Sequence, residues 1–550
     1  MNAVLEHLVA LPIVVPLLAG AAMLLLTESH RAARLTLAFT SIFVQSAAAI
    51  VLLYLTSDAA PFIWRNGIGV YTLGGWPAPF GIVLVADRLS AVMLTLEAVL
   101  GFAVLLYSVA RWDRPGQPFH SLMQFLMMGL NGAFLTGDLF SLFVFVEILL
   151  AASYGLMLRG VGATRVGIGL HYLVVNIVAS VLFLIGVAMI YGVMGTLNMA
   201  DLARRFTALA PEARTLFDTG AAILGVAFLV KAGTWPLNFW LPGTYSVAVA
   251  PVGAAFALMT KVGVYALMRV GTLMSEDEAA ASMLGVMMFY FGFATLVTGT
   301  FGMLAAHHLG RLVSYSVVVS TGILLAALGL GLEALTAPAL FYLIVSALTA
   351  GIFFMLTGMT DRTRSVPSAA APAEAPMPQS PFYAAFGVRE PDPYGTDEDV
   401  GVAIPRAIAF LGLVFVSCVL LVTGLPPLPG FIAKFALLST AIDAAPAVGL
   451  GNAAWALAAA VLLSGFAGVV ALTRVGIRLF WTVTARTTPR LRVLEAAPVA
   501  FLVALCIVLG TAASPIMEYL EHAAASLHEP QDYIRTVLSQ TDTGAAGVAP

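Results

Sequence analysis

The chain has 550 residues, of which 60% are hydrophobic and only 10% are charged, and its mean hydropathy is +0.97. Soluble domains carry about 25% charged residues, so there is too little charge here to coat a water-facing surface of this size, and a soluble enzyme is excluded. The net charge of −3 excludes a basic nucleic-acid-binding protein. Cys418 and Cys506 lie in apolar runs and are interpreted as core residues. No motif for a cofactor or a metal occurs.

Apolar runs long enough to cross a bilayer follow one another along the chain. A helical span needs about 20 mostly apolar residues. Gly, Pro and charge clusters divide the chain into about fourteen such spans: 4–26, 35–56, 87–110, 118–137, 139–158, 166–194, 218–242, 248–272, 281–304, 312–332, 338–360, 404–441, 451–481 and 495–520. Because the runs are continuous rather than alternating, a transmembrane β-barrel is excluded. We therefore expect an all-α polytopic membrane protein with a retained first span.

Loop composition predicts the orientation of these spans. The arginines of most short loops fall on one face of the membrane, and the acidic stretch 275–278 falls on the other, so both termini are expected on the outer face. The loop 195–216 disagrees, because it carries arginines on the outer face, and it fits only if it lies flat as an interfacial helix. Residues 361–403 are rich in Pro, Ala and acidic residues and predict a flexible linker on the inner face.

Five ionisable residues lie near the middle of their spans, where each costs about 2.5–3.5 kcal/mol to insert. They are Glu97, Glu147, Lys231, Lys261 and Lys434. Their placement on different helices suggests a polar line parallel to the membrane. Structural ion pairs are the alternative interpretation. Three lysines against two acids leave one amine unmatched, however, and such a lysine is a candidate for proton transfer.

Two of these lysines lie beside predicted helix breaks. Lys231 precedes its break by five residues, whereas Lys434 follows its break by five, and the sequence leaves this difference unexplained. Interrupted helices at membrane depth persist only where protein or water satisfies the freed backbone groups, and a pair of them points to a transport site. The residues of the two breaks are Pro236 in the first and Pro426, Pro427, Pro429 and Gly430 in the second.

Four residues are weaker candidates, and one of them is Glu97 from the five above. Asp138 opens a span and is interpreted first as an N-cap. Glu97 is interpreted as an interhelical hydrogen-bond partner in preference to a relay member. His307 and His308 lie in a loop and form either a solvated turn or a proton entry relay.

Four segments resemble the D-type subunit of the bacterial Mrp-type (also called Pha) multisubunit cation/proton antiporters. That protein is similar to the antiporter-like, proton-pumping subunits of respiratory complex I. The resemblance covers about residues 1–525, and TGDLF together with GTLNMADLA favours the Mrp D-type subunit over a complex I subunit. The segments are NGAFLTGDLFSLFVFVEILLAASYGLML (131–158), residues 171–203, residues 231–270 and GLPPLPGFIAKFALL (424–438).

The resemblance implies a fourteen-helix fold with two inverted five-helix repeats, in which helices seven and twelve are broken. In that family the glutamate of helix five pairs with the lysine of helix seven, which match Glu147 and Lys231, and the relay lysines match Lys261 and Lys434. Two departures are visible: Glu97 has no counterpart, and Ser320 stands where complex I subunits usually have His or Gln. The implied parts are 1–112 with helices 1–3, 113–272 as the first repeat, 273–482 as the second repeat including the linker 361–403, and 483–550 with helix 14 and a tail.

The resemblance further implies a proton-translocating subunit of a Na⁺(K⁺)/H⁺ antiporter in the bacterial inner membrane. It would be a secondary transporter subunit without a cofactor, and its partners would be subunits of the A, B, C, E, F and G types. Three alternatives stay open. They are a proton-pumping subunit of a complex I-like or membrane-hydrogenase complex, a self-sufficient solute permease, and a purely structural membrane scaffold. The sequence does not give the transported cation.

Overall fold

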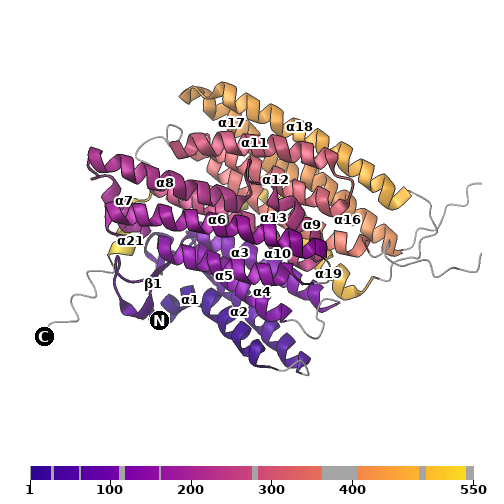
Figure 1. The fold of residues 1–550 in the computed structure, drawn as a ribbon, viewed down its shortest axis with the longest axis horizontal. Coiled ribbons are helices and arrows are strands. Elements are labelled where there is room, and N and C mark those ends of the chain that lie inside the picture. The colour runs from indigo at the N-terminus through magenta and orange to yellow at the C-terminus, as the bar shows by residue number, and fades with distance from the viewer. Residues whose placement is uncertain are drawn as a thin grey trace, which may run out of the picture.

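Long α-helices lie side by side in the computed structural model, which describes residues 2–26, 30–60, 63–110, 118–159, 163–274, 283–361, 406–481 and 491–539 (Figure 1). The helices of the first half are α1 (Asn2–Leu25), α2 (Arg31–Leu55), α3 (Arg88–Val109), α4 (Phe119–Leu135), α5 (Leu139–Met157), α6 (Ala163–Met194), α7 (Met199–Phe206), α8 (Pro211–Ala232), α9 (Trp240–Val247) and α10 (Ala250–Leu273). Those of the second half are α11 (Met283–Ala305), α12 (Leu309–Leu328), α13 (Glu333–Thr360), α16 (Arg406–Thr423), α17 (Pro429–Ala444), α18 (Gly451–Gly476), α19 (Val493–Thr511), α20 (Ala513–His528) and α21 (Gln531–Leu538). The N-terminal helices α1 and α2 form one edge of the bundle, and α17 and α18 form the opposite edge (Figure 1).

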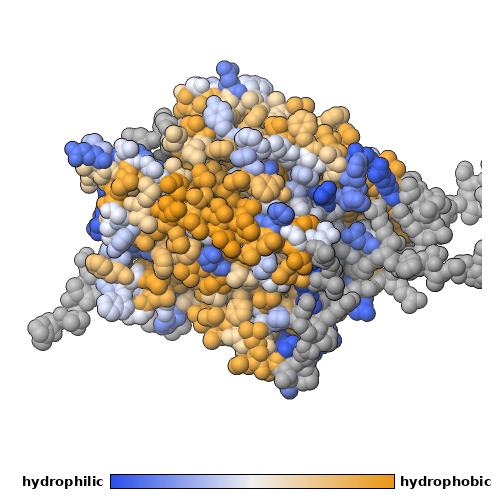
Figure 2. Space-filling view, viewed as in Figure 1, coloured by the Kyte–Doolittle hydropathy of each residue, from blue (hydrophilic) through white to orange (hydrophobic). Residues whose placement is uncertain are grey.

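The predicted all-α membrane fold is confirmed. Fourteen stretches of the described chain are long and apolar enough to cross a membrane. This count includes 406–423 and 429–448 separately and leaves out α4, which has 17 residues. When 406–423 and 429–448 are counted as the two halves of one interrupted pass and α4 is added, the number of passes agrees with the predicted fourteen. Figure 2 shows apolar side chains across the middle of one face and hydrophilic side chains toward its two ends, as a membrane-embedded surface requires.

The centre of the bundle is formed by α10 and α13. The most apolar stretch of α10 is entirely buried, and that of α13 is almost entirely buried. Outer helices instead expose large apolar side chains, among them Leu18 of α1, Val178 of α6 and Val508 of α19. A helix that is apolar all round and covered by protein belongs to the interior. Any ionisable group on α10 is therefore held away from lipid.

The structure differs from the predicted elements in two places. Residues 69–72 and 83–86 form an antiparallel hairpin of β1 (Gly69–Thr72) and β2 (Val83–Ala86), in which Gly69 faces Ala86. Their short runs of β-branched residues favour a strand over a helix. The predicted span 495–520 is wrong as one helix, because α19 ends at Thr511 and α20 follows it. The linker 361–403 lies outside the described residues apart from Asp361.

The arginine-rich loop 195–216 contains the helix α7. Its arginines Arg204 and Arg205 both bind the buried Asp201, at 2.5 and 2.9 Å. Arg214 forms a further ion pair with Asp218 at 3.4 Å. Each of these arginines is therefore paired with a carboxylate, which reduces the weight of this loop as an orientation signal.

Candidate functional site

Both interrupted helices end at a glycine with a left-handed backbone. Gly233 follows α8 with φ 78°, and Gly424 follows α16 with φ 76°. Residues with side chains rarely adopt this conformation, so a glycine here stops the helix. The predicted breaks are present, but each begins before its proline. Pro236 lies inside the first break, Pro426 and Pro427 lie inside the second, and Pro429 and Gly430 begin α17.

The lysines of the two breaks occupy equivalent places. Lys231 lies in the last turn of α8. Lys434 starts from α17 but reaches back, and its Nζ donates to the carbonyls of Val422 at 2.8 Å and Thr423 at 3.2 Å, at the end of α16. The Lys434 ammonium therefore lies at the carboxyl end of one first half-helix, where unpaired carbonyls carry partial negative charge, and Lys231 stands on the last turn of the other first half-helix. This placement explains why the lysine and the break occur in opposite order in the two segments.

A serine of α6 joins Glu147 of α5 to Lys231. Lys231 Nζ lies 3.9 Å from Glu147 Oε1, which is longer than a direct charge-assisted hydrogen bond of about 2.7–2.9 Å. Instead, Lys231 Nζ donates to Ser180 Oγ at 3.2 Å, and the Ser180 hydroxyl donates to Glu147 Oε1. The Glu147 side chain is 32% exposed, whereas that of Lys231 is 9% exposed. The acid and the base are thus bridged by a hydroxyl group and not closed into direct contact.

Lys261 lies in the buried interior on α10. Its side chain is 1% exposed, and its Nζ donates to Ser320 Oγ of α12 at 2.9 Å. Gly263 brings α10 against α8, because a Cβ at this position would lie 2.7 Å from the backbone nitrogen of Ala232. Ala232 directly follows Lys231. The first two lysines therefore flank one tight helix–helix contact.

A small hydroxyl-lined cavity lies between the partners of Lys261 and Lys434. It has a volume of about 30 Å³ and includes Ser320 and Val422 in its wall. One water molecule needs roughly 10–15 Å³ of such space and two to four polar partners. The further polar residues of the wall are Ser316, Tyr342, Ser346 and Thr349. The site therefore has room for water beside Ser320.

The distribution of lysine and arginine was a signal that the sequence interpretation missed. The chain contains 23 arginines but only three lysines, and the three are Lys231, Lys261 and Lys434. Arginine stays charged in proteins, whereas lysine gives up its proton when burial requires it. The chain thus uses arginine wherever a fixed positive charge suffices. Ser180, in contrast, could not be recognised from the sequence, because nothing in its apolar helix sets this serine apart from the other serines.

The weaker candidates lie apart from this line. Asp138 caps α5, as predicted, by accepting from the backbone N–H groups of Phe140 at 2.8 Å and Ser141 at 2.9 Å. Burial raises the pKa of Asp138, although these N–H groups lower it in part. His307 and His308 are exposed in the turn between α11 and α12, which fits a solvated turn.

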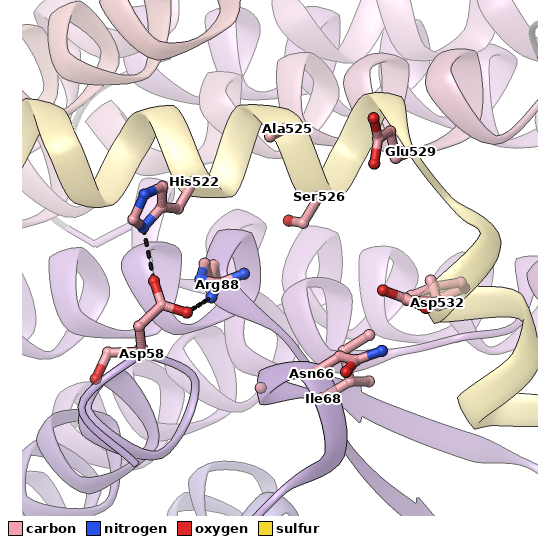
Figure 3. A pocket seen from close by; sticks show the side chains of 12 residues that line it. Asp58, Asn66, Ile68, Arg88, His522, Ala525, Ser526, Glu529 and Asp532 are labelled. Atoms are coloured by element: carbon pink, nitrogen blue, oxygen red, sulfur yellow. Dashed lines mark hydrogen bonds and ion pairs between the residues drawn. The ribbon is translucent and has the colours of Figure 1, made fainter. Parts of the chain in front are cut away.

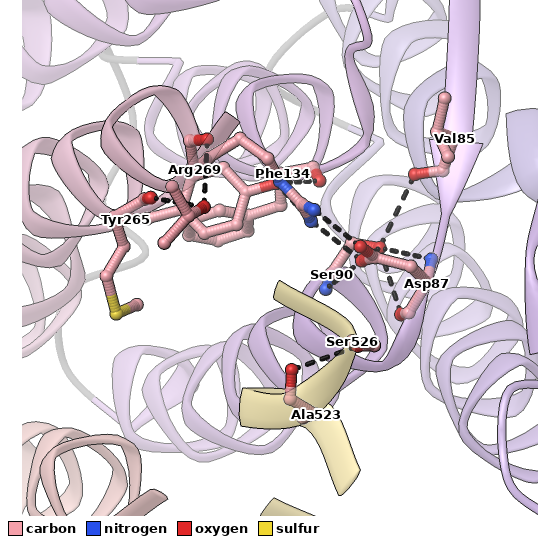
Figure 4. Close-up of polar contacts among 10 residues, drawn as sticks. Val85, Asp87, Ser90, Phe134, Tyr265, Arg269, Ala523 and Ser526 are labelled. Atoms are coloured by element: carbon pink, nitrogen blue, oxygen red, sulfur yellow. Dashed lines mark hydrogen bonds and ion pairs between the residues drawn. The ribbon is translucent and has the colours of Figure 1, made fainter. Parts of the chain in front are cut away.

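A buried ion pair at the end of α10 was not predicted. Arg269, two turns after Lys261, donates to the two carboxylate oxygens of Asp87 at 2.5 and 2.7 Å (Figure 4). Burial would raise the pKa of Asp87, but the facing guanidinium outweighs it and holds the pKa below its ordinary value. Between them along α10, the Tyr265 hydroxyl donates to the carbonyl of Phe134 at 2.6 Å. These contacts fix α10 against the ends of α3 and α4 and so orient the helix of Lys261.

A cavity of about 620 Å³ opens beside this ion pair, between α20 and the start of α3 (Figure 3). At its wall, His522 Nδ1 lies 2.7 Å from Asp58, which also binds Arg88 at 2.5 Å. The three side chains tie α20 to the loop that follows α2. The sequence interpretation did not find this cavity, since its wall combines residues from both ends of the chain.

A bundle with two interrupted helices, each with a buried lysine beside its break, defines an antiporter-like polytopic membrane protein. A family model described as "NADH:quinone oxidoreductase/Mrp antiporter, TM" matches residues 136–374. The chain is 48% identical over 547 residues to the probable K⁺/H⁺ antiporter D-type subunit of Rhizobium meliloti, covering 98% of this chain and 99% of that one. It is 32% identical to the Na⁺/H⁺ antiporter D-type subunit of Alkalihalophilus pseudofirmus, covering 98% and 100%. A chain of the Mrp complex from Dietzia shares the fold, with a TM-score of 0.80 at 23% identity over 97% of this chain and 99% of that one. The protein belongs to the family of Mrp antiporter D-type subunits.

Proposed function

We propose that this chain is the proton-translocating subunit of a multisubunit monovalent cation/proton antiporter. The observation that carries this function is the placement of every lysine of the chain on one line of buried hydroxyl, carbonyl and carboxylate partners. The names of the relatives support the same class, since they are D-type subunits of K⁺/H⁺ or Na⁺/H⁺ antiporters. The chain is thus a secondary transporter subunit, and no step of its work requires a cofactor.

In the proposed mechanism, Glu147 and Lys231 form a switchable pair. When the pair closes, Lys231 is held charged, and its repulsion favours proton loss from Lys261. When it opens, Lys231 transfers its proton, or acts through its electric field, along the line of lysines toward Lys434. The proton path from Lys261 runs through Ser320 and water in the hydroxyl-lined cavity.

The energies of this switch are compatible with a respiratory membrane. At the 3.9 Å separation of Lys231 Nζ and Glu147 Oε1, two unit charges attract by about 4 kcal/mol at an effective dielectric constant near 20. A charge that crosses 100 mV gains about 2.3 kcal/mol. Two protons that cross 100 mV, or one that crosses about 200 mV, therefore supply about 4.6 kcal/mol, which is enough to open the pair.

The two broken helices suggest that the chain contains two related halves. The residue ranges 113–272 and 273–482 each contain one interrupted helix, with an αL glycine at the end of its first half and a buried lysine beside the break. We assign these ranges to the first and second antiporter repeats. Residues 1–112 and 483–550 then flank them.

The subunit requires partners in a bacterial cell membrane, with both termini on the outer face. The large apolar side chains on the outer helices provide surface for lipid and for neighbouring subunits of the A, B, C, E, F and G types. The second candidate is a proton-pumping subunit of a complex I-like or membrane-hydrogenase complex, which the description of the matching family favours in part. Co-purification with redox subunits would decide for this candidate.

The test uses the complete complex in inverted membrane vesicles. Lys231→Ala and Lys434→Ala should each abolish Na⁺- or K⁺-dependent proton exchange while the complex still assembles. Arg535→Ala is the matched control, because it removes a positive charge on α21, away from the lysine line. Exchange at the parental rate in either lysine variant would refute the proposed function. Exchange by the chain without any partner would favour a self-sufficient permease.

A further inference from the structure

A second polar cluster lies between α1, α2, α3 and α4, outside the lysine line. Its five side chains are each at most 2% exposed. Ser41 Oγ donates to Gln124 Oε1 at 2.6 Å, and Gln45 Nε2 donates to Ser41 Oγ at 2.9 Å. Asn131 Nδ2 donates to Gln45 Oε1 at 3.1 Å, and Glu97 of α3 completes the cluster within hydrogen-bonding reach of Asn131.

The orientation of the Asn131 amide is fixed by a proline in α1. In a helix the carbonyl of Pro12 accepts from the N–H of residue 16, but Pro16 has no N–H group. Asn131 Nδ2 takes its place and donates to the Pro12 carbonyl at 2.9 Å. With the bond to Gln45, both N–H groups of this amide are used. Asn131 therefore has only its Oδ1 left for Glu97.

The cluster thus holds buried acceptor atoms that no N–H or O–H group of the cluster satisfies. Within the part of the chain that the structure describes, neither carboxylate oxygen of Glu97 has a hydrogen-bond partner, and Asn131 Oδ1 also has none. A buried polar group without a partner costs about 1–3 kcal/mol, and a buried carboxylate costs more. We propose that Glu97 is a proton-binding site, in which the carboxyl group holds a proton and donates it to Asn131 Oδ1. One proton satisfies both groups and removes the buried charge.

The packing around Glu97 favours a proton over a metal cation. A Cβ at Gly101, one turn along α3, would lie 2.7 Å from Met127 Cε and 3.3 Å from Glu97 Oε1. The carboxyl group is thus enclosed by close contacts, whereas a bound Na⁺ or K⁺ needs several oxygen ligands around it. A proton needs only the carboxyl oxygen that binds it and one acceptor, and it occupies no space of its own.

No opposite charge replaces this proton among the described groups. The polar residues that face Glu97 from α2 and α4 are all uncharged. The charged and titratable residues of the helices packed against α3 lie at helix ends or bind other partners. They are Glu6 and His7 on α1, Arg31, Arg34 and Tyr54 on α2, Arg88 and Tyr107 on α3, His120 on α4, Lys261, Tyr265 and Arg269 on α10, Glu333 on α13, Glu495 on α19, and Glu518, Tyr519, Glu521, His522 and His528 on α20. Tyr342 on α13 lies in the wall of the hydroxyl-lined cavity.

Infrared spectroscopy of the purified complete complex at neutral pH tests this site directly. The difference between the parent and Glu97→Gln should show the loss of one carboxylic acid C=O band, and the band in the parent should be insensitive to added Na⁺ or K⁺. Glu212→Gln is the matched control, because Glu212 is exposed in the first turn of α8 and should lose carboxylate bands instead. Loss of carboxylate bands in Glu97→Gln, or a band that disappears with Na⁺ or K⁺, would overturn the proton site.

Thermal melting of the same complexes gives a second measurement. Glu97→Gln should keep the parental Tm, because an amide N–H can donate to Asn131 Oδ1 as the protonated acid does. Glu97→Ala should lower the Tm, since it leaves Asn131 Oδ1 without a donor and opens a cavity. An equal fall in both variants would contradict the inference. Neither measurement depends on ion exchange. The proton site at Glu97 can therefore be confirmed or refuted separately from the proposed transport function.

Discussion

Glu147→Gln is the sharpest perturbation of the switch, because it keeps the size of the side chain and removes its charge. The attraction between unit charges at 3.9 Å is about 4 kcal/mol at an effective dielectric constant near 20. Exposure of about a third of the Glu147 side chain screens this interaction, so a loss of about 2–4 kcal/mol is expected. At about 1.4 kcal/mol per factor of ten, exchange should fall by roughly 30-fold to 1,000-fold.

The assay follows the recovery of a pH-sensitive dye in inverted vesicles when Na⁺ or K⁺ is added. The amount of assembled complex is measured in the same membranes. Glu212→Gln serves as the control, since it makes the same chemical change on the exposed first turn of α8. An assembled Glu147→Gln complex that exchanges within about twofold of the parent would refute the switchable pair, because the smallest fall in exchange expected from the lost attraction is roughly 30-fold.

Three other substitutions test the remaining parts of the site. Lys261→Arg should stop exchange while retaining the charge, because arginine does not release its proton; normal transport would leave Lys261 with an electrostatic role only. Ser320→Ala should slow exchange about tenfold, as expected for a lost hydrogen bond to a charged group, whereas Ser314→Ala on the same helix should not, since Ser314 bonds to the carbonyl of Gly310 in its own helix. Asp87→Asn should lower the free energy of unfolding by about 3–5 kcal/mol, because it leaves Arg269 buried without its partner. The lowered pKa of Asp87 means that its contribution is complete above the ordinary value of 3.8 and is lost only as the pH falls through the lowered pKa, so the Tm difference between parent and variant should stay constant between neutral and mildly acidic pH; a difference that shrinks over this range would contradict the pairing.

The buried charges could be predicted from the sequence because each contrasts with its surroundings. An isolated Lys231 or Glu147 in twenty apolar residues is visible without any knowledge of the fold. Ser180 could not be found in this way. Most hydroxyl groups in these helices bond to a carbonyl of their own helix. Ser180 Oγ also lies 2.9 Å from its own Asn176 carbonyl, an alternative acceptor for its one proton, so only the position of α5 and α8 shows its second role.

Contacts between distant segments set the other limit. Asp87 and Arg269 are 182 residues apart and each lies at the end of a span, where charged residues are common. The same limit applies to Lys434, whose side chain crosses a helix break to reach Val422 and Thr423. Sequence spacing gives the positions of the lysine and the break but not the direction in which the side chain returns.

The carboxyl ends of the half-helices give a physical reason for coupling protonation to position. A charged ammonium is attracted to the unpaired carbonyls at such an end, worth up to about 2 kcal/mol in partly buried sites, and a neutral amine loses most of this attraction. Loss of a proton from Lys434 would therefore weaken its hold on Val422 and Thr423 and free the side chain to move toward the hydroxyl-lined cavity. Lys231 stands on the last turn of α8, but its ammonium bonds to Ser180 beside Glu147, so loss of its proton would weaken its hold on that pair. Arginine at either position would remain charged and bound, which is why a chain with 23 arginines has kept lysine at these helix ends and beside Ser320.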